Sequence, residues 1–200
     1  MEEKTKRIVV VGIPGVGKTT IVSSVKDILE EKGVKTILAE FGKIMLEEAN
    51  KLNIKNRDEI RRLSIYEQKK LQNLAAEKIT QINADVVVID THLFINTKEG
   101  YYPGLPFDLL TCLKPTNLIL ITANPEEIYH RRQNDPSRDR DMVSMDSIKN
   151  DIDVSKMLIS CCSIVSGAPF KVLVNHENSI TDCTEKMASL ILDSTPNKDK

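Results

Sequence analysis

The sequence predicts an α/β fold in three layers, a five-stranded parallel sheet with helices on both faces. Five short apolar runs, rich in Val and Ile, have the continuous pattern of strands that are buried on both faces. Helical patterns separate them, and strands that alternate with helices form parallel sheets. The predicted strands span residues 7–12, 35–41, 85–90, 117–122 and 171–175.

A glycine-rich loop follows the first strand. Residues 12–19, GIPGVGKT, match G-x-x-x-x-G-K-[ST] between a strand and a helix that runs to Gly33, which is the context that supports this motif. Glycines let the backbone wrap closely around an anion, and the N–H groups and the helix N-terminus then face phosphates. In such loops the lysine, here Lys18, reaches the β and γ phosphates, and the hydroxyl of Thr19 is a Mg²⁺ ligand. We therefore predict a P-loop NTPase fold. The predicted phosphate-binding residues are Gly12, Ile13, Pro14, Gly15, Val16, Gly17, Lys18, Thr19 and Thr20.

The connection between the second and third strands, residues 42–84, is too long for a simple crossover. It reads as wholly helical, and both NRDE at 56–59 and SIYE at 64–67 have the pattern of a capping box, so a new helix should begin at each. We expect a helical insertion at the sheet edge, within a single domain that spans residues 1–194.

The third strand, VVVID, ends in Asp90. Ligands bind at the C-terminal ends of strands in open parallel sheets, so Asp90 is a candidate to hold Mg²⁺ through water. The alternative is an aspartate that caps the following turn. His92 is either a base or a loop histidine with a local hydrogen bond. Residues 91–116 contain GYYPGLP and should form a loop.

The remaining elements follow the same alternation. A helix should begin at Asn124, with Pro125 at its first position. Further helical patterns cover about 145–162 and 181–192, and the tail, 195–200, should be disordered.

Seven of the eight arginines fall into two clusters that both follow C-terminal ends of predicted strands, on the side of the phosphate loop. Two such segments can close over a string of phosphates from two directions. A kinase that phosphorylates a hydroxyl benefits from a carboxylate base, whereas a phosphate acceptor is already an anion and needs cations that hold it in place. The arginines therefore favour a nucleotide acceptor. The clusters are Arg57, Arg61 and Arg62 in the insertion, and Arg131, Arg132, Arg138 and Arg140 after the fourth strand.

Several segments, taken in order, resemble the archaeal-type adenylate kinases, and the similarity covers nearly the whole chain. They are VVGIPGVGKTT, NRDEIRRLSIYEQKKLQ, IDTH, GYYPGLP and RRQNDPSRDR. The resemblance implies the Mg²⁺-dependent reaction of ATP with AMP to give two ADP, in the cytoplasm, by a protein that is typically a homotrimer.

The resemblance also implies roles for individual residues. Residues 12–20 bind the ATP phosphates. Independently of the resemblance, we place Asp90, at the end of the third strand, in the substrate and Mg²⁺ site. The insertion at 42–84 binds AMP through Arg57, Arg61 and Arg62. Arg131 and Arg132 lie near the ATP adenine or its phosphates, and Arg138 and Arg140 belong to a short lid at 133–141. We expect Lys18, Arg131, Arg138 and Arg140 to be catalytic. The lid lacks the cysteine tetrad of zinc-bearing lids, so no zinc is expected.

The composition of the chain argues against a membrane protein, a secreted protein and a zinc-binding protein. The chain is 40% hydrophobic and 28% charged, with a formal net charge of -1, as in ordinary globular domains. No stretch approaches the roughly 18 apolar residues of a membrane span, and the start, MEEKTKRIVVVG, reads as neither a signal nor a transit peptide. The four cysteines, Cys112, Cys161, Cys162 and Cys183, form no C-x-x-C pair, so we expect buried free thiols.

Two alternatives stay open. A related kinase could phosphorylate another nucleoside monophosphate or a hydroxyl, with Asp90 as the base. A non-catalytic nucleic-acid module could use the arginines on a phosphodiester backbone, although the near-neutral charge and the few aromatic residues argue against it. The pattern of a GTP switch is missing, because the fifth strand ends in VNHE instead of N-K-x-D.

Overall fold

The computed structural model describes residues 5–97, 100–134, 144–177 and 179–193, without the side chains of Arg57, Asp58 and Arg61. The predicted parallel sheet is confirmed, with the strand order β2-β3-β1-β6-β7. Each predicted strand agrees with the observed one to within one residue at either end. The strands are β1 (Lys6–Val11), β2 (Thr36–Glu40), β3 (Val86–Asp90), β6 (Asn117–Thr122) and β7 (Phe170–Val174).

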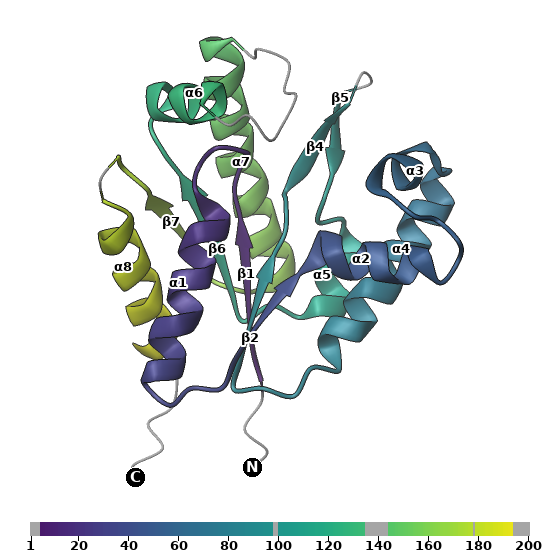
Figure 1. The fold of residues 1–200 in the computed structure, drawn as a ribbon, viewed down its shortest axis with the longest axis horizontal. Coiled ribbons are helices and arrows are strands. Elements are labelled where there is room, and N and C mark those ends of the chain that lie inside the picture. Colours follow the sequence, from purple (N-terminus) through teal and green to yellow (C-terminus); the bar gives the residue numbers. More distant parts are fainter. Residues whose placement is uncertain (1–4, 98–99, 135–143, 178, 194–200) are drawn as a thin grey trace.

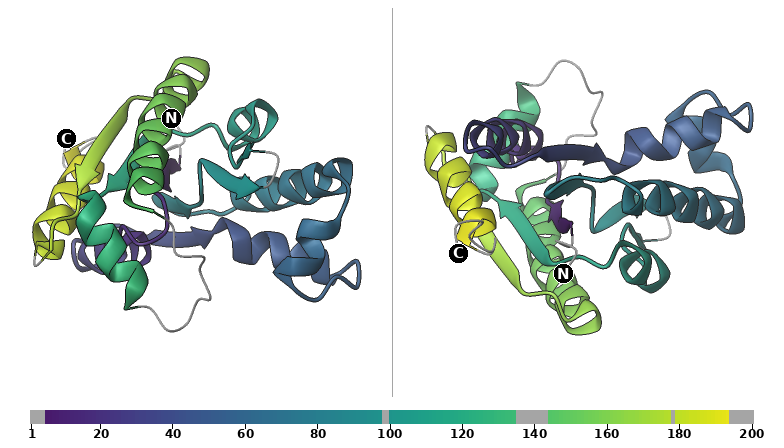
Figure 2. Two further views of the ribbon diagram at one scale, coloured as in Figure 1. Left: turned by 90° about the horizontal axis from the view of Figure 1, so that it is seen from above. Right: turned by 90° about the horizontal axis from the view of Figure 1, so that it is seen from below.

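Helices cover both faces of this sheet, as predicted (Figures 1 and 2). α1 (Lys18–Glu31) and α8 (Ile180–Asp193) pack together on one face. α4 (Ile65–Thr80), α5 (Phe107–Leu113) and α7 (Met145–Ser166) cover the other. α6 (Pro125–Gln133) follows β6 and packs on α7. The side chains of the central strands are almost fully buried, so the apolar runs of the sequence form the core between these layers.

The residues between β2 and β3 form a helical lobe at the sheet edge, made of α2 (Phe41–Asn50), α3 (Arg57–Arg62) and α4. α2 packs along α4, and Ala49, Ile60 and Leu71 form a small separate core. Helices begin at both predicted caps, but the complete capping box is present at Ser64, whereas the Glu59 carboxylate accepts from the Lys55 N–H and the Asn56 amide. The side chain of Asn56 accepts a hydrogen bond from the N–H of Glu59 at 2.8 Å, and Ser64 with Glu67 forms a capping box.

The prediction of a loop at 91–116 is wrong. β4 (Phe94–Thr97) and β5 (Gly100–Pro103) form an antiparallel hairpin outside the main sheet, and α5 follows. The rings of Phe94 and Tyr101 meet edge to face at 4.6 Å, and the leucines of α5 are buried. These short elements are stabilised by tertiary packing, which a local reading of Gly and Pro residues does not contain.

All four cysteines are free thiols, but they are not all buried. Cys183 is buried, Cys112 and Cys162 are partly buried, and Cys161 is exposed because it lies on the solvent side of α7. Among the described helices, none is both long enough and apolar enough to cross a membrane.

Candidate active site

The phosphate loop lies between the end of β1 and the start of α1. Gly17 is in the left-handed region, with φ 83°, directly before Lys18. At Gly12 a Cβ atom would lie only 2.5 Å from the carbonyl oxygen of Ile121 on β6. These two positions therefore need glycine for different reasons, one for its backbone conformation and one for its packing against the sheet. The loop has the shape that the sequence motif predicts.

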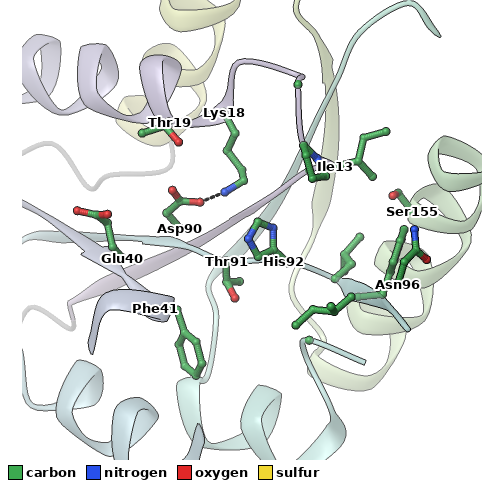
Figure 3. A pocket seen from close by; sticks show the side chains of 18 of the residues that line it. Ile13, Lys18, Thr19, Glu40, Phe41, Asp90, Thr91, His92, Asn96 and Ser155 are labelled. Atoms are coloured by element: carbon green, nitrogen blue, oxygen red, sulfur yellow. Dashed lines mark hydrogen bonds and ion pairs between the residues drawn. The ribbon is translucent and has the colours of Figure 1, made fainter. Parts of the chain in front are cut away.

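Lys18 and Asp90 form an ion pair at the C-terminal edge of the sheet (Figure 3). Parallel pairing of β1 with β3 places Val10 opposite Asp90, so the carboxylate comes next to the residues that follow β1. The Lys18 and Asp90 side chains are only 9% and 12% exposed. Thr19 lines the same cavity as Lys18 and Asp90, so the three predicted phosphate and metal residues border one space.

A cavity of about 870 Å³ extends from the phosphate loop in two directions. On one side it reaches Glu40 and Phe41 and the helical lobe, and on the other it reaches Asn96 of the hairpin and Ser155 of α7 (Figure 3). His92, which is exposed to solvent, also lines it. One continuous space thus connects the phosphate loop with the segment that carries the first arginine cluster.

The two arginines of α6 contact the phosphate loop from outside. Arg132 donates from Nε to the carbonyl oxygen of Pro14 at 2.9 Å. Arg131 donates to the carbonyl oxygens of Asn175 at 3.1 Å and, more weakly, of Val16 at 3.5 Å. Arg131 also lines the cavity. In this structure both side chains therefore contact the loop that was predicted to hold ATP.

For the other predicted arginines the structure describes only part of each cluster. Arg57, Arg61 and Arg62 lie on α3, where Ile60 lines the cavity and Arg62 is exposed, but the side chains of Arg57 and Arg61 lie outside the described part of the structure. Arg138 and Arg140, and residues 135–141 of the predicted lid, lie outside the described residues, as does the tail 195–200.

Sequence reasoning missed a polar network on the α7 side of the cavity. Asp151 is 3% exposed and accepts hydrogen bonds from Tyr101 at 2.9 Å and from Asn96 at 3.3 Å. Asn96 and Tyr101 face each other across the hairpin, and Asn150 donates to the Tyr101 hydroxyl at 2.6 Å. Burial, and then the hydrogen bond to Asp151, raises the pKa of Tyr101. The network attaches the hairpin to α7.

Comparisons with known proteins identify the family of this chain. The family described as AAA domain matches residues 11–149. The adenylate kinase of Methanocaldococcus jannaschii is 33% identical over 190 residues, which cover 94% of this chain and 99% of that protein. The adenylate kinase of Saccharolobus solfataricus is 39% identical over 176 residues, with 84% and 90% covered. The chain belongs to the adenylate kinase family. The adenylate kinase of Pyrococcus horikoshii, 38% identical over 173 residues with 86% and 87% covered, supports the same assignment.

A comparison with solved structures shows a similar fold. The shikimate kinase from Acinetobacter baumannii in complex with shikimate superposes with a TM-score of 0.59, covering 99% of this chain and 97% of that chain, at 17% identity. At this identity the likeness concerns the fold only. It agrees with the P-loop kinase architecture of an adenylate kinase family member and confirms the predicted fold class.

Proposed function

We propose that this protein is an adenylate kinase that transfers the γ-phosphate of ATP reversibly to AMP and yields two ADP. The observation that carries the proposal is the continuous cavity between the phosphate loop and the helical lobe, in a chain 33% identical to an adenylate kinase over nearly its whole length. A donor on the loop and an acceptor on the lobe would share that cavity, which is the arrangement that direct transfer between two bound nucleotides requires.

On the donor side, residues 12–20 hold the ATP phosphates, and the Lys18 ammonium leaves Asp90 to meet the β and γ phosphates. Thr19 and Asp90 line the same cavity, and the Thr19 hydroxyl and the Asp90 carboxylate are both hard oxygen donors of the kind that Mg²⁺ prefers. They therefore fit a Mg²⁺ site, with Thr19 as a direct ligand and Asp90 acting through water. When bound, Mg²⁺ neutralises charge on the phosphates.

On the acceptor side, the insertion at 42–84 binds AMP through Arg57, Arg61 and Arg62. The short lid at 133–141 brings Arg138 and Arg140 to the transferring phosphate. Arg131 and Arg132, on α6, lie near the adenine or the phosphates of ATP. A phosphate acceptor needs no general base, and arginines offset the repulsion between the two anions. This division assigns one arginine cluster to each side of the reaction, in a single domain spanning 1–194 with no zinc in its lid.

A hydroxyl acceptor is the competing function, because the cavity contains the carboxylate of Asp90, which could serve as a base. The pairing of Asp90 with Lys18 favours the phosphate and metal role instead. A panel of AMP, CMP, UMP and shikimate, with ATP as donor and enzyme-coupled detection of ADP, separates the two. We expect kcat/KM to be highest for AMP. Turnover of shikimate without turnover of any monophosphate would overturn the proposal.

We further propose a cytoplasmic homotrimer with no nucleic-acid or membrane partner. Support for an oligomer comes from an exposed apolar surface on α7, where Met157, Ile164 and Val165 are 61%, 83% and 51% exposed. The net charge of -1 supports the absence of a nucleic-acid partner. Light scattering should give a mass near three times 22.5 kDa, and a monomer mass would contradict the trimer.

A further inference from the structure

The carbonyl groups of the phosphate loop need hydrogen-bond donors of their own. A loop that turns successive N–H groups toward an anion directs carbonyls to its outer side, where a buried carbonyl must find a partner. At Pro14, which is exposed, the carbonyl oxygen accepts a hydrogen bond from the Arg132 guanidinium, whereas Val16 is only 1% exposed. The carbonyl oxygen of Val16 accepts a hydrogen bond from a residue much further along the chain.

That donor is the side chain of Asn175, the residue directly after β7. Its Nδ2 donates to the carbonyl oxygen of Val16 at 2.8 Å, across 159 residues of sequence. Asn175 is 3% exposed, so this hydrogen bond is shielded from water. The backbone N–H of Asn175 donates to the carbonyl oxygen of Thr122 at 2.7 Å, which fixes the residue to the end of β6.

The same amide packs against Gly17. A Cβ atom at Gly17 would lie 2.5 Å from Nδ2 of Asn175, and Gly17 has the left-handed φ of 83° directly before Lys18. Arg131 also contacts the Asn175 carbonyl oxygen at 3.1 Å and the Val16 carbonyl oxygen at 3.5 Å. The turn that presents Lys18 is therefore held by Asn175 at short range, with α6 as a second and weaker support.

We propose that Asn175 is a positioning residue for ATP binding. Its amide fixes the Val16 carbonyl on the outer side of the loop, so that the N–H groups around Gly17 face the phosphates before nucleotide arrives. The inference rests on the proposed phosphate-binding role of the loop, but it does not depend on which acceptor receives the phosphate. Nothing in the P-loop motif indicates this residue, which lies in VNHE at the other end of the chain.

The test compares Asn175→Asp with Asn175→Ala, with calorimetric binding of a non-hydrolysable ATP analogue as the readout. Asp has nearly the shape of Asn but cannot donate a hydrogen bond when ionised, so at pH 8 both variants should bind the analogue roughly 5- to 100-fold more weakly than the wild type. Burial raises the pKa of a carboxyl group, so the carboxyl introduced at this 3% exposed position should be protonated in a much larger fraction of molecules at pH 5 than at pH 8, and in that form it donates to the Val16 carbonyl oxygen. The affinity of Asn175→Asp relative to the wild type should then recover, whereas that of Asn175→Ala should stay low.

The pH comparison also guards against misfolding, because the protonated side chain of Asn175→Asp keeps nearly the shape and the donor of Asn175, whereas Asn175→Ala removes both. Thr122→Val is the matched control, because it changes a buried side chain at the end of β6 but keeps the backbone carbonyl that accepts from Asn175, and no hydrogen bond joins Thr122 to Val16 among the described residues. Thr122→Val should bind the analogue like the wild type. Wild-type affinity in both Asn175 variants, or no recovery of Asn175→Asp at low pH, would overturn the proposal. If the binding results hold and AMP is not phosphorylated, the proposed function fails while the role of Asn175 stands.

Discussion

Replacement of Asp90 by Asn should lower the free energy of unfolding of the nucleotide-free protein, because it removes the ion pair between Asp90 and Lys18. The Asp90 carboxylate pairs with the Lys18 ammonium, and the two side chains are 12% and 9% exposed. An exposed ion pair contributes about 0–1 kcal/mol, whereas removal of one partner from a fully buried pair costs about 3–5 kcal/mol. Water in the neighbouring cavity can reach Lys18, so we place the loss at about 1.5–3 kcal/mol, as for a hydrogen bond to a charged group.

Urea unfolding of the nucleotide-free protein measures this loss. Asp153→Asn is the matched control, because Asp153 pairs with Lys156 at 3.1 Å while both side chains are at least half exposed. The control should change the free energy of unfolding by less than about 0.5 kcal/mol. An Asp90→Asn protein as stable as the control would refute the reasoning that this pair is shielded and contributes to stability. In a second readout, metal-free ATP should bind Asp90→Asn at least as tightly as the wild type, since the carboxylate no longer competes for Lys18.

Three further predictions concern individual groups. Lys18→Ala should lower kcat by about 100-fold or more in a folded protein, because the ammonium meets charge that grows on the transferring phosphate; near-normal kcat would contradict the phosphate-loop assignment. Arg57→Ala or Arg61→Ala should raise KM for AMP by roughly 10- to 150-fold with little change for ATP, as expected for one lost charge-assisted contact; the reverse pattern in steady-state kinetics would exchange the roles of the two arginine clusters. Asp151→Ala should lower the pKa of Tyr101, because tyrosinate would no longer form beside a carboxylate. Alkaline titration followed by tyrosinate absorbance measures this pKa, and Tyr101→Phe identifies the signal of Tyr101. An unchanged midpoint in Asp151→Ala would count against the network.

The sequence was sufficient for the elements whose signal is local. Buried parallel strands are continuous apolar runs, so all five were found, and the caps at Asn56 and Ser64 follow from three-residue spacings. The phosphate loop was predictable because its geometry depends on glycines at fixed positions in one short segment. Lys18 and Asp90 could be assigned to one site because the ends of parallel strands share one edge of the sheet.

The parts that were missed depend on contacts between distant segments. The strands of the hairpin are four residues each and α5 has seven, too short for a periodic pattern, and packing against α4 and α7 stabilises α5. Asp151 and Asn175 are single polar residues whose partners lie 50 and 159 positions away. For Asn175 one signal was available, since a polar residue directly after a strand lies at the ligand-binding edge of the sheet.

The most direct measurement of the central claim uses ADP as the only nucleotide. An enzyme that transfers phosphate from ATP to AMP has ADP as both of its products, so it can run its reaction backwards from ADP alone. A kinase for a hydroxyl or for another nucleoside monophosphate would need a second phosphorylated product. With ADP and Mg²⁺, chromatography of the nucleotides should show ATP and AMP appearing in equal amounts, and Lys18→Ala should slow the formation of both by about 100-fold or more. No ATP formation by the folded wild-type protein, under conditions where it turns over ATP with another acceptor, would contradict the assignment of adenylate kinase activity.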